Sequence, residues 1–199
     1  MIPIVPTPDS VRSRLVQFDN DPRYYGADQA IQLVIDQWPD NNNALHILIK
    51  TVLINRLYST QIFAVYEAAQ HIFTLQIDER LRKGEISLVT DVAQMKNIGA
   101  HGRNNLSFAA KYCAWHQPDL FQIWDNLVVG LLWQYRKAHN FAEFKRNDLY
   151  CYPRFMKINE SFKSFFGLQQ FSRKEIDKFL YIEARLAAEA EAGIPSEKV

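Results

Sequence analysis

Apolar residues recur every three or four positions from Asn42 to about Gln76, and this periodicity is the strongest in the chain. Such spacing places apolar side chains along one face of an α-helix. It predicts two helices with a break at Tyr58–Ser59–Thr60, where Ser59 or Thr60 would cap the second helix. Glycine, which hairpin turns require, is scarce, and no segment alternates convincingly like a strand. We therefore expect an all-α protein with about eight to ten helices.

Further helices are predicted on both sides of this segment, at about residues 10–18, 27–38, 78–83, 87–95, 106–115, 119–138, 153–167 and 173–192. The stretch DNDPRYYGAD is read as a loop, and Pro118-Asp119 as the start of a helix. Ser172, followed three residues later by Glu175, predicts a capping box for the last helix. At 199 residues, we expect a single globular domain with two helical lobes. One lobe would comprise residues 1–41 and 121–192, the other residues 42–120, and residues 193–199 a frayed tail.

Composition excludes several classes of protein. The apolar fraction of 48% and the charged fraction of 23% are those of a globular chain rather than a disordered one. The N-terminus lacks a signal-peptide pattern, and the longest apolar stretch, LHILIKTVLI, is interrupted by Lys50 and too short to cross a bilayer. Cys113 and Cys151 form no disulfide framework and are expected to be small buried hydrophobic residues. We therefore expect a protein of the reducing cytoplasm, away from membranes.

Motifs for metals and nucleotide cofactors do not occur in the sequence. The five histidines, at positions 46, 71, 101, 116 and 139, form neither an HxxxH nor an HExxH pair, and Cys-x-x-Cys spacing is absent. There is no phosphate-binding loop GxxxxGKS/T, no GxGxxG and no GxSxG elbow. We therefore expect neither a metal nor a cofactor.

Positive charge is concentrated in one window of a chain whose net charge is only +1. No acidic residue occurs from Val92 to Pro118, where Lys96, Arg103 and Lys111 lie. A local basic face on a neutral protein is typical of contact with a polyanion. A chance run of sequence explains the window equally well.

Three segments of the sequence resemble the catalytic core of the helix-hairpin-helix DNA glycosylases. The segment VLINRLYSTQIFAVYEAAQHI resembles its opening helix–turn–helix, with Ser59-Thr60-Gln61 at the turn. The segment MKNIGAHGRNNLSFAAKYCAWH is similar to its glycine turn and following helix, and FQIWDNLV to the approach to its essential aspartate. FAAKYCAWHQPDLFQIWD and SRKEIDKFLY also resemble a bacterial family of unknown function related to 8-oxoguanine glycosylases. The resemblance implies a two-lobed helical fold that binds duplex or single-stranded DNA.

The resemblance also implies roles for individual residues. Lys111 would attack the sugar carbon and form a Schiff base, and Asp125 would stabilise the sugar cation or activate the nucleophile. Tyr58, Trp115 and Trp124 would hold the base after it leaves the stack. In bifunctional members the catalytic lysine follows the second glycine of the hairpin, where this chain has an asparagine. Lys111 would therefore substitute for it.

DNA contacts are implied for the glycine turn and for Gln61. Glycines before a helix expose backbone N–H groups that can hold a phosphate. Gln61 would fill the gap that the extruded base leaves in the duplex. The residues assigned to DNA binding are Gly99, His101, Gly102, Arg103, Asn104 and Gln61.

Each of these assignments has a structural alternative. Asp125 is equally well explained as the N-cap of the following helix, a role compatible with catalysis. Lys111 is read as a solvated amine, the tryptophans and Tyr58 as core residues, and Gly102-Arg103 as a turn with an exposed charge. The alternative for the whole protein is a non-catalytic helical interaction protein, including an inactive glycosylase relative.

Overall fold

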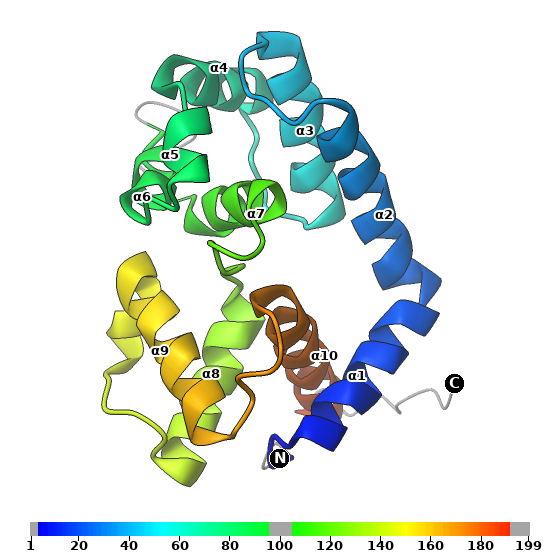
Figure 1. The fold of residues 1–199 in the computed structure, drawn as a ribbon, viewed down its shortest axis with the longest axis vertical. Coiled ribbons are helices and arrows are strands. Elements are labelled where there is room, and N and C mark those ends of the chain that lie inside the picture. Colours follow the sequence, from blue (N-terminus) through cyan, green and yellow to red (C-terminus); the bar gives the residue numbers. More distant parts are fainter. Residues whose placement is uncertain (1–3, 96–104, 192–199) are drawn as a thin grey trace. The chain divides into compact units, whose positions relative to one another are not determined.

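The computed structural model describes residues 4–95 and 105–191, and in these ranges every regular element is helical (Figure 1). The elements are α1 (Pro8–Asn20), α2 (Pro22–Gln37), α3 (Ala44–Leu57), α4 (Val65–Leu75), α5 (Asp78–Arg82), α6 (Ser87–Ala93), α7 (Leu106–His116), α8 (Asn126–His139), the short 3-10 helix η1 (Arg146–Tyr150), α9 (Tyr152–Phe165) and α10 (Arg173–Glu191). The all-α prediction is confirmed, and the ten α-helices of the described ranges agree with the expected number. None of these helices combines the length and the apolar character needed to cross a membrane.

Two compact units make up the chain. The middle unit runs from Pro22 to Ile123 and contains α2 to α7. The terminal unit joins the residues up to Asp21 with those from Trp124 onward, and it contains α1, α8, η1, α9 and α10. This division differs from the predicted lobes at residues 22–41, because α2 packs against α3 and α7.

Helix α7 is the centre of the middle unit, in contact with α2, α3 and α6. Its side chains are buried on every side rather than along one stripe, as expected for a helix enclosed by neighbours. The buried residues are Leu106, Phe108, Ala109, Ala110, Lys111, Tyr112, Cys113, Ala114 and Trp115. The enclosure of α7 therefore takes one lysine into the core together with the apolar residues.

Asn41, in the loop between α2 and α3, connects three helices by hydrogen bonds. Its Oδ1 accepts from the hydroxyl of Tyr112 on α7 at 2.6 Å and from Nζ of Lys50 on α3 at 2.7 Å. Its backbone N–H and its amide nitrogen both donate to Asp78 of α5. We call these four residues the Asn41 hub. Lys50, which interrupts an apolar run in the sequence, is only 1% exposed, and its hydrogen bond to Asn41 joins α3 to the loop that precedes it.

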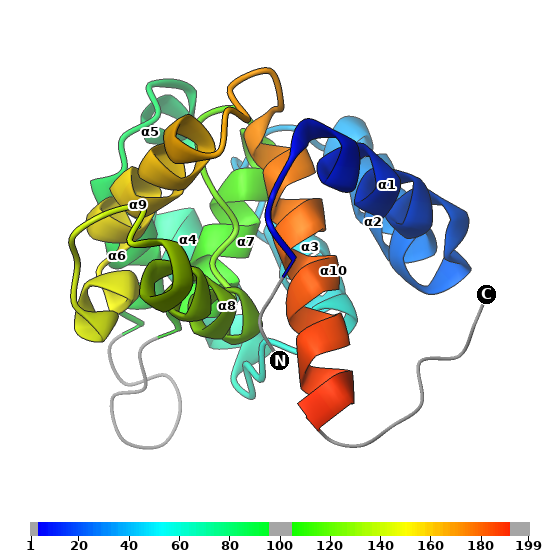
Figure 2. The ribbon, with the colours of Figure 1, turned by 90° about the horizontal axis from the view of Figure 1, so that it is seen from below.

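In the terminal unit, α10 packs against both α1 and α8 (Figure 2). Arg14 of α1 forms an ion pair with the buried Glu183 of α10 and so joins the two helices. The predicted capping box at the start of α10 is confirmed. The backbone N–H of Ser172 donates to Glu175 Oε2 at 2.7 Å, and that of Glu175 donates to Ser172 Oγ at 3.2 Å.

Two predicted helix boundaries are wrong. Helix α2 begins at Pro22, inside the segment read as a loop, because proline is well suited to the first position of a helix. The helix predicted from Pro118 begins at Asn126 instead. Phe121 and Trp124, in the intervening segment, are buried although the segment is not helical.

Two further expectations are also corrected. Helix α4 begins at Val65, and neither Ser59 nor Thr60 caps it, because the loop continues as far as Ala64. Cys113 is buried as expected, but Cys151 is exposed, because it lies in the connection before α9 rather than on a core-facing helix surface.

Candidate functional site

Lys111 lies on α7 and is 1% exposed, so its interpretation as a solvated amine is wrong. Its Nζ donates a hydrogen bond to Oγ of Ser107, one turn earlier on the same helix, at 2.8 Å. Lysine is almost never fully buried unless its charge is stabilised by partners. A buried amine in a mostly apolar helix is therefore unusual, and in the middle unit Lys111 shares this feature with Lys50 of α3.

The ring of Tyr58 covers this amine. Nζ of Lys111 lies 5.5 Å from the centroid of the Tyr58 ring, within the range of a cation–π interaction. The ring of Trp115, one turn after Lys111 on α7, lies 6.4 Å from that of Tyr58 and is tilted against it by 56°. Three residues that the sequence analysis selected for chemistry and base binding thus come together.

Tyr58 has a further partner that the sequence analysis did not select. Its hydroxyl donates a hydrogen bond to Oδ1 of Asp28 on α2 at 3.1 Å. Asp28 lies 30 residues earlier in the chain, and no local motif marks it, so only the packing of α2 could reveal the contact. We call Asp28, Tyr58, Ser107, Lys111 and Trp115 the Lys111 cluster.

The loop after Tyr58 has an uncommon backbone conformation. Ser59 and Gln61 have φ angles of 50° and 60°, in the left-handed region that glycine usually occupies. Asn55 holds the loop, because its side chain accepts from Thr60 Oγ1 and from the Ile62 backbone N–H and donates to the Ile62 carbonyl. Each such residue costs on the order of 1 kcal/mol, and this strain is most common near functional sites. Gln61 is exposed on this loop, and its role in DNA binding stays a prediction.

Asp125 and Trp124 belong to the terminal unit. Asp125 is the N-cap of α8, and its Oδ1 accepts from the backbone N–H of Leu127 at 2.9 Å, as the structural alternative predicted. Trp124 is buried, and its indole N–H donates to the carbonyl of Leu149 at 2.7 Å. The predicted catalytic role of Asp125 is compatible with capping, and it stays a prediction.

Gly99, His101, Gly102, Arg103 and Asn104, all assigned to DNA binding, lie outside the described residues.

Two other ionisable side chains of α7, Cys113 and His116, are held in their neutral forms. Burial raises the pKa of the Cys113 thiol well above its ordinary value, which makes this cysteine unsuitable as a nucleophile. Burial, with the nearby charge of Lys50, lowers the pKa of His116 to about 3, although a hydrogen bond to the Pro39 backbone opposes this shift. Within the described ranges, no three His, Cys, Asp or Glu side chains gather closely enough to hold a metal ion.

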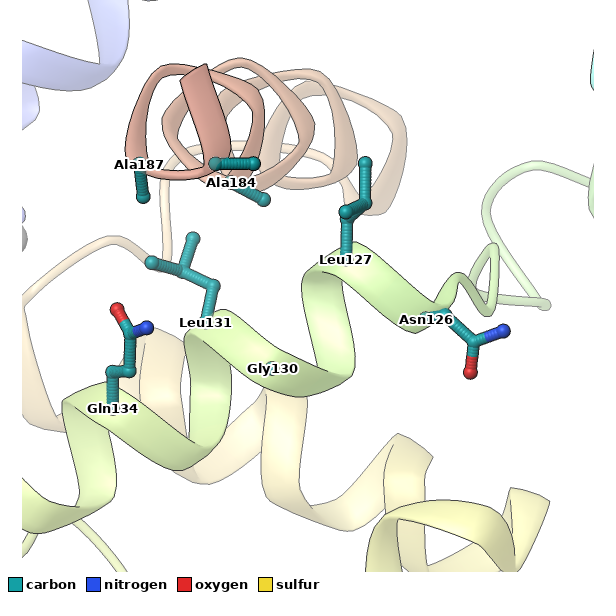
Figure 3. A pocket seen from close by; sticks show the side chains of 8 residues that line it. Asn126, Leu127, Gly130, Leu131, Gln134, Ala184 and Ala187 are labelled. Carbon is teal, nitrogen blue, oxygen red and sulfur yellow. The ribbon is translucent and has the colours of Figure 1, made fainter. Parts of the chain in front are cut away.

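A pocket of about 140 Å³ lies in the terminal unit between α8 and α10. Figure 3 shows Leu127 and Leu131 of α8 facing Ala184 and Ala187 of α10. The lining residues are Asn126, Leu127, Gly130, Leu131, Gln134, Ala184, Ala187 and Ala188. None of the residues selected from the sequence lines it, so the Lys111 cluster is the better candidate site.

A family of known sequences matches the part of the chain that holds the Lys111 cluster. Residues 10–120 match the family HI_0787_N, N-terminal domain, a span that holds the whole cluster and ends before Asp125. A Haemophilus influenzae protein described as uncharacterized is 37% identical over 129 residues. That match covers 64% of this chain and 61% of the relative's length, and the relative's description states no activity.

No solved structure matches the chain. The relative confirms a relationship to a bacterial protein described as uncharacterized, whereas the relationship to the DNA glycosylases stays a prediction. Because residues 10–120 are more than half of the 199, the chain belongs to the HI_0787_N family, whose N-terminal domain it contains.

Proposed function

We propose that this protein is a DNA-binding base-excision protein, resembling the 8-oxoguanine-type glycosylases, that uses Lys111 as its nucleophile. The observation that supports the proposal most strongly is the buried amine of Lys111 beneath the ring of Tyr58, with Trp115 beside it. An enzyme that acts on an extruded base needs aromatic surfaces to hold the base and a nucleophile within reach of the sugar.

The reaction requires the neutral form of the amine. The lone pair of Lys111 Nζ attacks C1′ of the deoxyribose, the N-glycosidic bond breaks, and the base leaves with the electron pair of that bond. The proton lost from the attacking amine neutralises the departing base. The C1′–O4′ bond then breaks, the remaining N–H proton passes to O4′, and an imine forms between Nζ and C1′. Borohydride reduces this imine to a stable secondary amine.

Asp125 is proposed to supply a carboxylate that stabilises the positive charge of the sugar in the transition state. Its N-cap hydrogen bond would keep the carboxylate in one orientation. Its role is tested separately from that of Lys111, by the loss of base release in Asp125→Asn.

The test is borohydride trapping on a duplex, and on a single strand, that carries an oxidised purine. We expect wild type to form a covalent protein–DNA adduct, and the cross-linked peptide, identified by mass spectrometry, to contain Lys111. Lys111→Gln should abolish the adduct and retain DNA binding and the helical circular dichroism spectrum. Lys83→Gln is the matched control, because Lys83 lies in the same unit and its side chain is 68% exposed.

Each negative outcome has a definite meaning. An adduct on another lysine would refute the role of Lys111. DNA binding that weakens with salt, without any adduct or base release, would indicate an inactive glycosylase relative. Absence of both binding and adduct would refute the base-excision proposal and favour a helical interaction protein.

A further inference from the structure

Asp28 is connected to Lys111 through the ring of Tyr58. Oδ1 of Asp28 accepts from the Tyr58 hydroxyl at 3.1 Å, and Nζ of Lys111 lies 5.5 Å from the centroid of the same ring. The three residues come from α2, the C-terminal end of α3 and α7, so the contact joins three helices of the middle unit. Tyr58 is thus held at its hydroxyl by a carboxylate while its face meets an amine.

Tyr58 is also held at its backbone. Its N–H donates to the carbonyl of Ile54, as the C-cap of α3, and the loop that follows is fastened by Asn55. With the backbone fixed, the swing of the side chain about its Cα–Cβ bond decides whether the ring lies over Lys111. The hydrogen bond from the Tyr58 hydroxyl to Asp28 restricts this swing.

We propose that Asp28 is a positioning residue that acts through Tyr58 to orient the amine of Lys111. This inference rests on the proposed function only for its kinetic consequence. The orientation itself is a property of the protein without DNA. Without the acceptor the ring swings away from Nζ of Lys111, the amine gains freedom, and its approach to C1′ becomes less favourable. A displacement of this kind slows a reaction by about tenfold to a hundredfold.

The first experiment measures the initial rate of borohydride-trapped adduct formation in a double-mutant cycle. Asp28→Ala and Tyr58→Phe should each slow the adduct by about tenfold, and the double variant should be no slower than either. Asp28→Asn should recover most of the rate, because its amide oxygen still accepts from the hydroxyl. Asp36→Ala is the matched control, an exposed carboxylate on the same helix, and should leave the rate unchanged. Effects that simply add would refute action through Tyr58.

The second experiment needs no DNA and separates this inference from the proposed function. Protons above an aromatic ring resonate upfield, so the ε-methylene of Lys111 should be shifted upfield of the exposed lysines in the NMR spectrum of lysine-labelled protein. The shift should disappear in Tyr58→Leu and fall by more than half in Asp28→Ala, but persist in Asp36→Ala. An unchanged shift in Asp28→Ala would overturn the proposal. A reduced shift without any adduct in wild type would retain the positioning role and refute the base-excision function.

Discussion

Replacing Asn41 by alanine is expected to destabilise the middle unit by about 4 kcal/mol. Asn41 is 1% exposed, and its Oδ1 accepts from both Tyr112 and Lys50. The alanine variant leaves the Tyr112 hydroxyl without this acceptor inside the core, at a cost of about 1–3 kcal/mol. Lys50 still donates hydrogen bonds to the carbonyls of Trp38 and Asp40 but loses its shortest one, to Asn41. Because the donor is charged, this loss adds about 1.5–3 kcal/mol to the destabilisation.

The measurement is urea unfolding followed by circular dichroism, with Asn43→Ala as the matched control. Asn43 lies two residues later and caps α3 by accepting from the backbone N–H of Leu45, so its loss should cost only about 1 kcal/mol. Combining Asn41→Ala with Tyr112→Phe removes the buried hydroxyl as well, and should recover about 1–2 kcal/mol. If Asn41→Ala costs no more than Asn43→Ala, or if Tyr112→Phe recovers nothing, the buried-donor reasoning is refuted.

Two further predictions concern titration and capping. Burial lowers the pKa of His116 to about 3, so below pH 6.5 the unfolded chain binds a proton that the folded chain does not. The free energy of unfolding should therefore fall by about 2 kcal/mol between about pH 7 and pH 5. An equal dependence of stability on pH in His116→Phe would contradict this prediction. Burial also lowers the pKa of Lys50 to about 8, so stability should rise between about pH 8 and 9, below the pH at which the Cys113 thiol ionises in the unfolded chain, as urea midpoints would show. Asp125→Ala should cost about 1 kcal/mol by loss of the α8 cap, whereas Asp125→Asn should keep the thermal midpoint and abolish base release.

Sequence reasoning succeeded where the physical cause is local. The apolar periodicity of residues 42–76 predicted α3 and α4, because helical spacing depends on neighbouring residues within one turn. The capping box of Ser172 and Glu175 was predicted for the same reason. Asp125 was recognised as an N-cap because the capped N–H groups lie within the next three residues.

Sequence reasoning failed where the cause lies in packing between distant segments. Lysine side chains are usually exposed, so residue type alone predicts an exposed Lys111. Lys111 is buried because α2, α3 and α6 enclose α7. The Asn41 hub joins residues that are 37 and 71 positions apart, and no spacing rule predicts such a partner. The contact of Asp28 with Tyr58 likewise depends on where α2 lies against α3.

For the candidate site, too, some features could be proposed from the sequence and others depended on tertiary packing. The identities of Lys111, Tyr58 and Trp115 could be proposed from the sequence because a resemblance named them, and the two aromatic residues carry surfaces suited to stacking. Their proximity, and the carboxylate of Asp28 beside them, were decided by tertiary structure. Local sequence determines which residues form each helix, but the chemistry of a side chain depends on its burial and partners, which arise only when helices distant in sequence pack together.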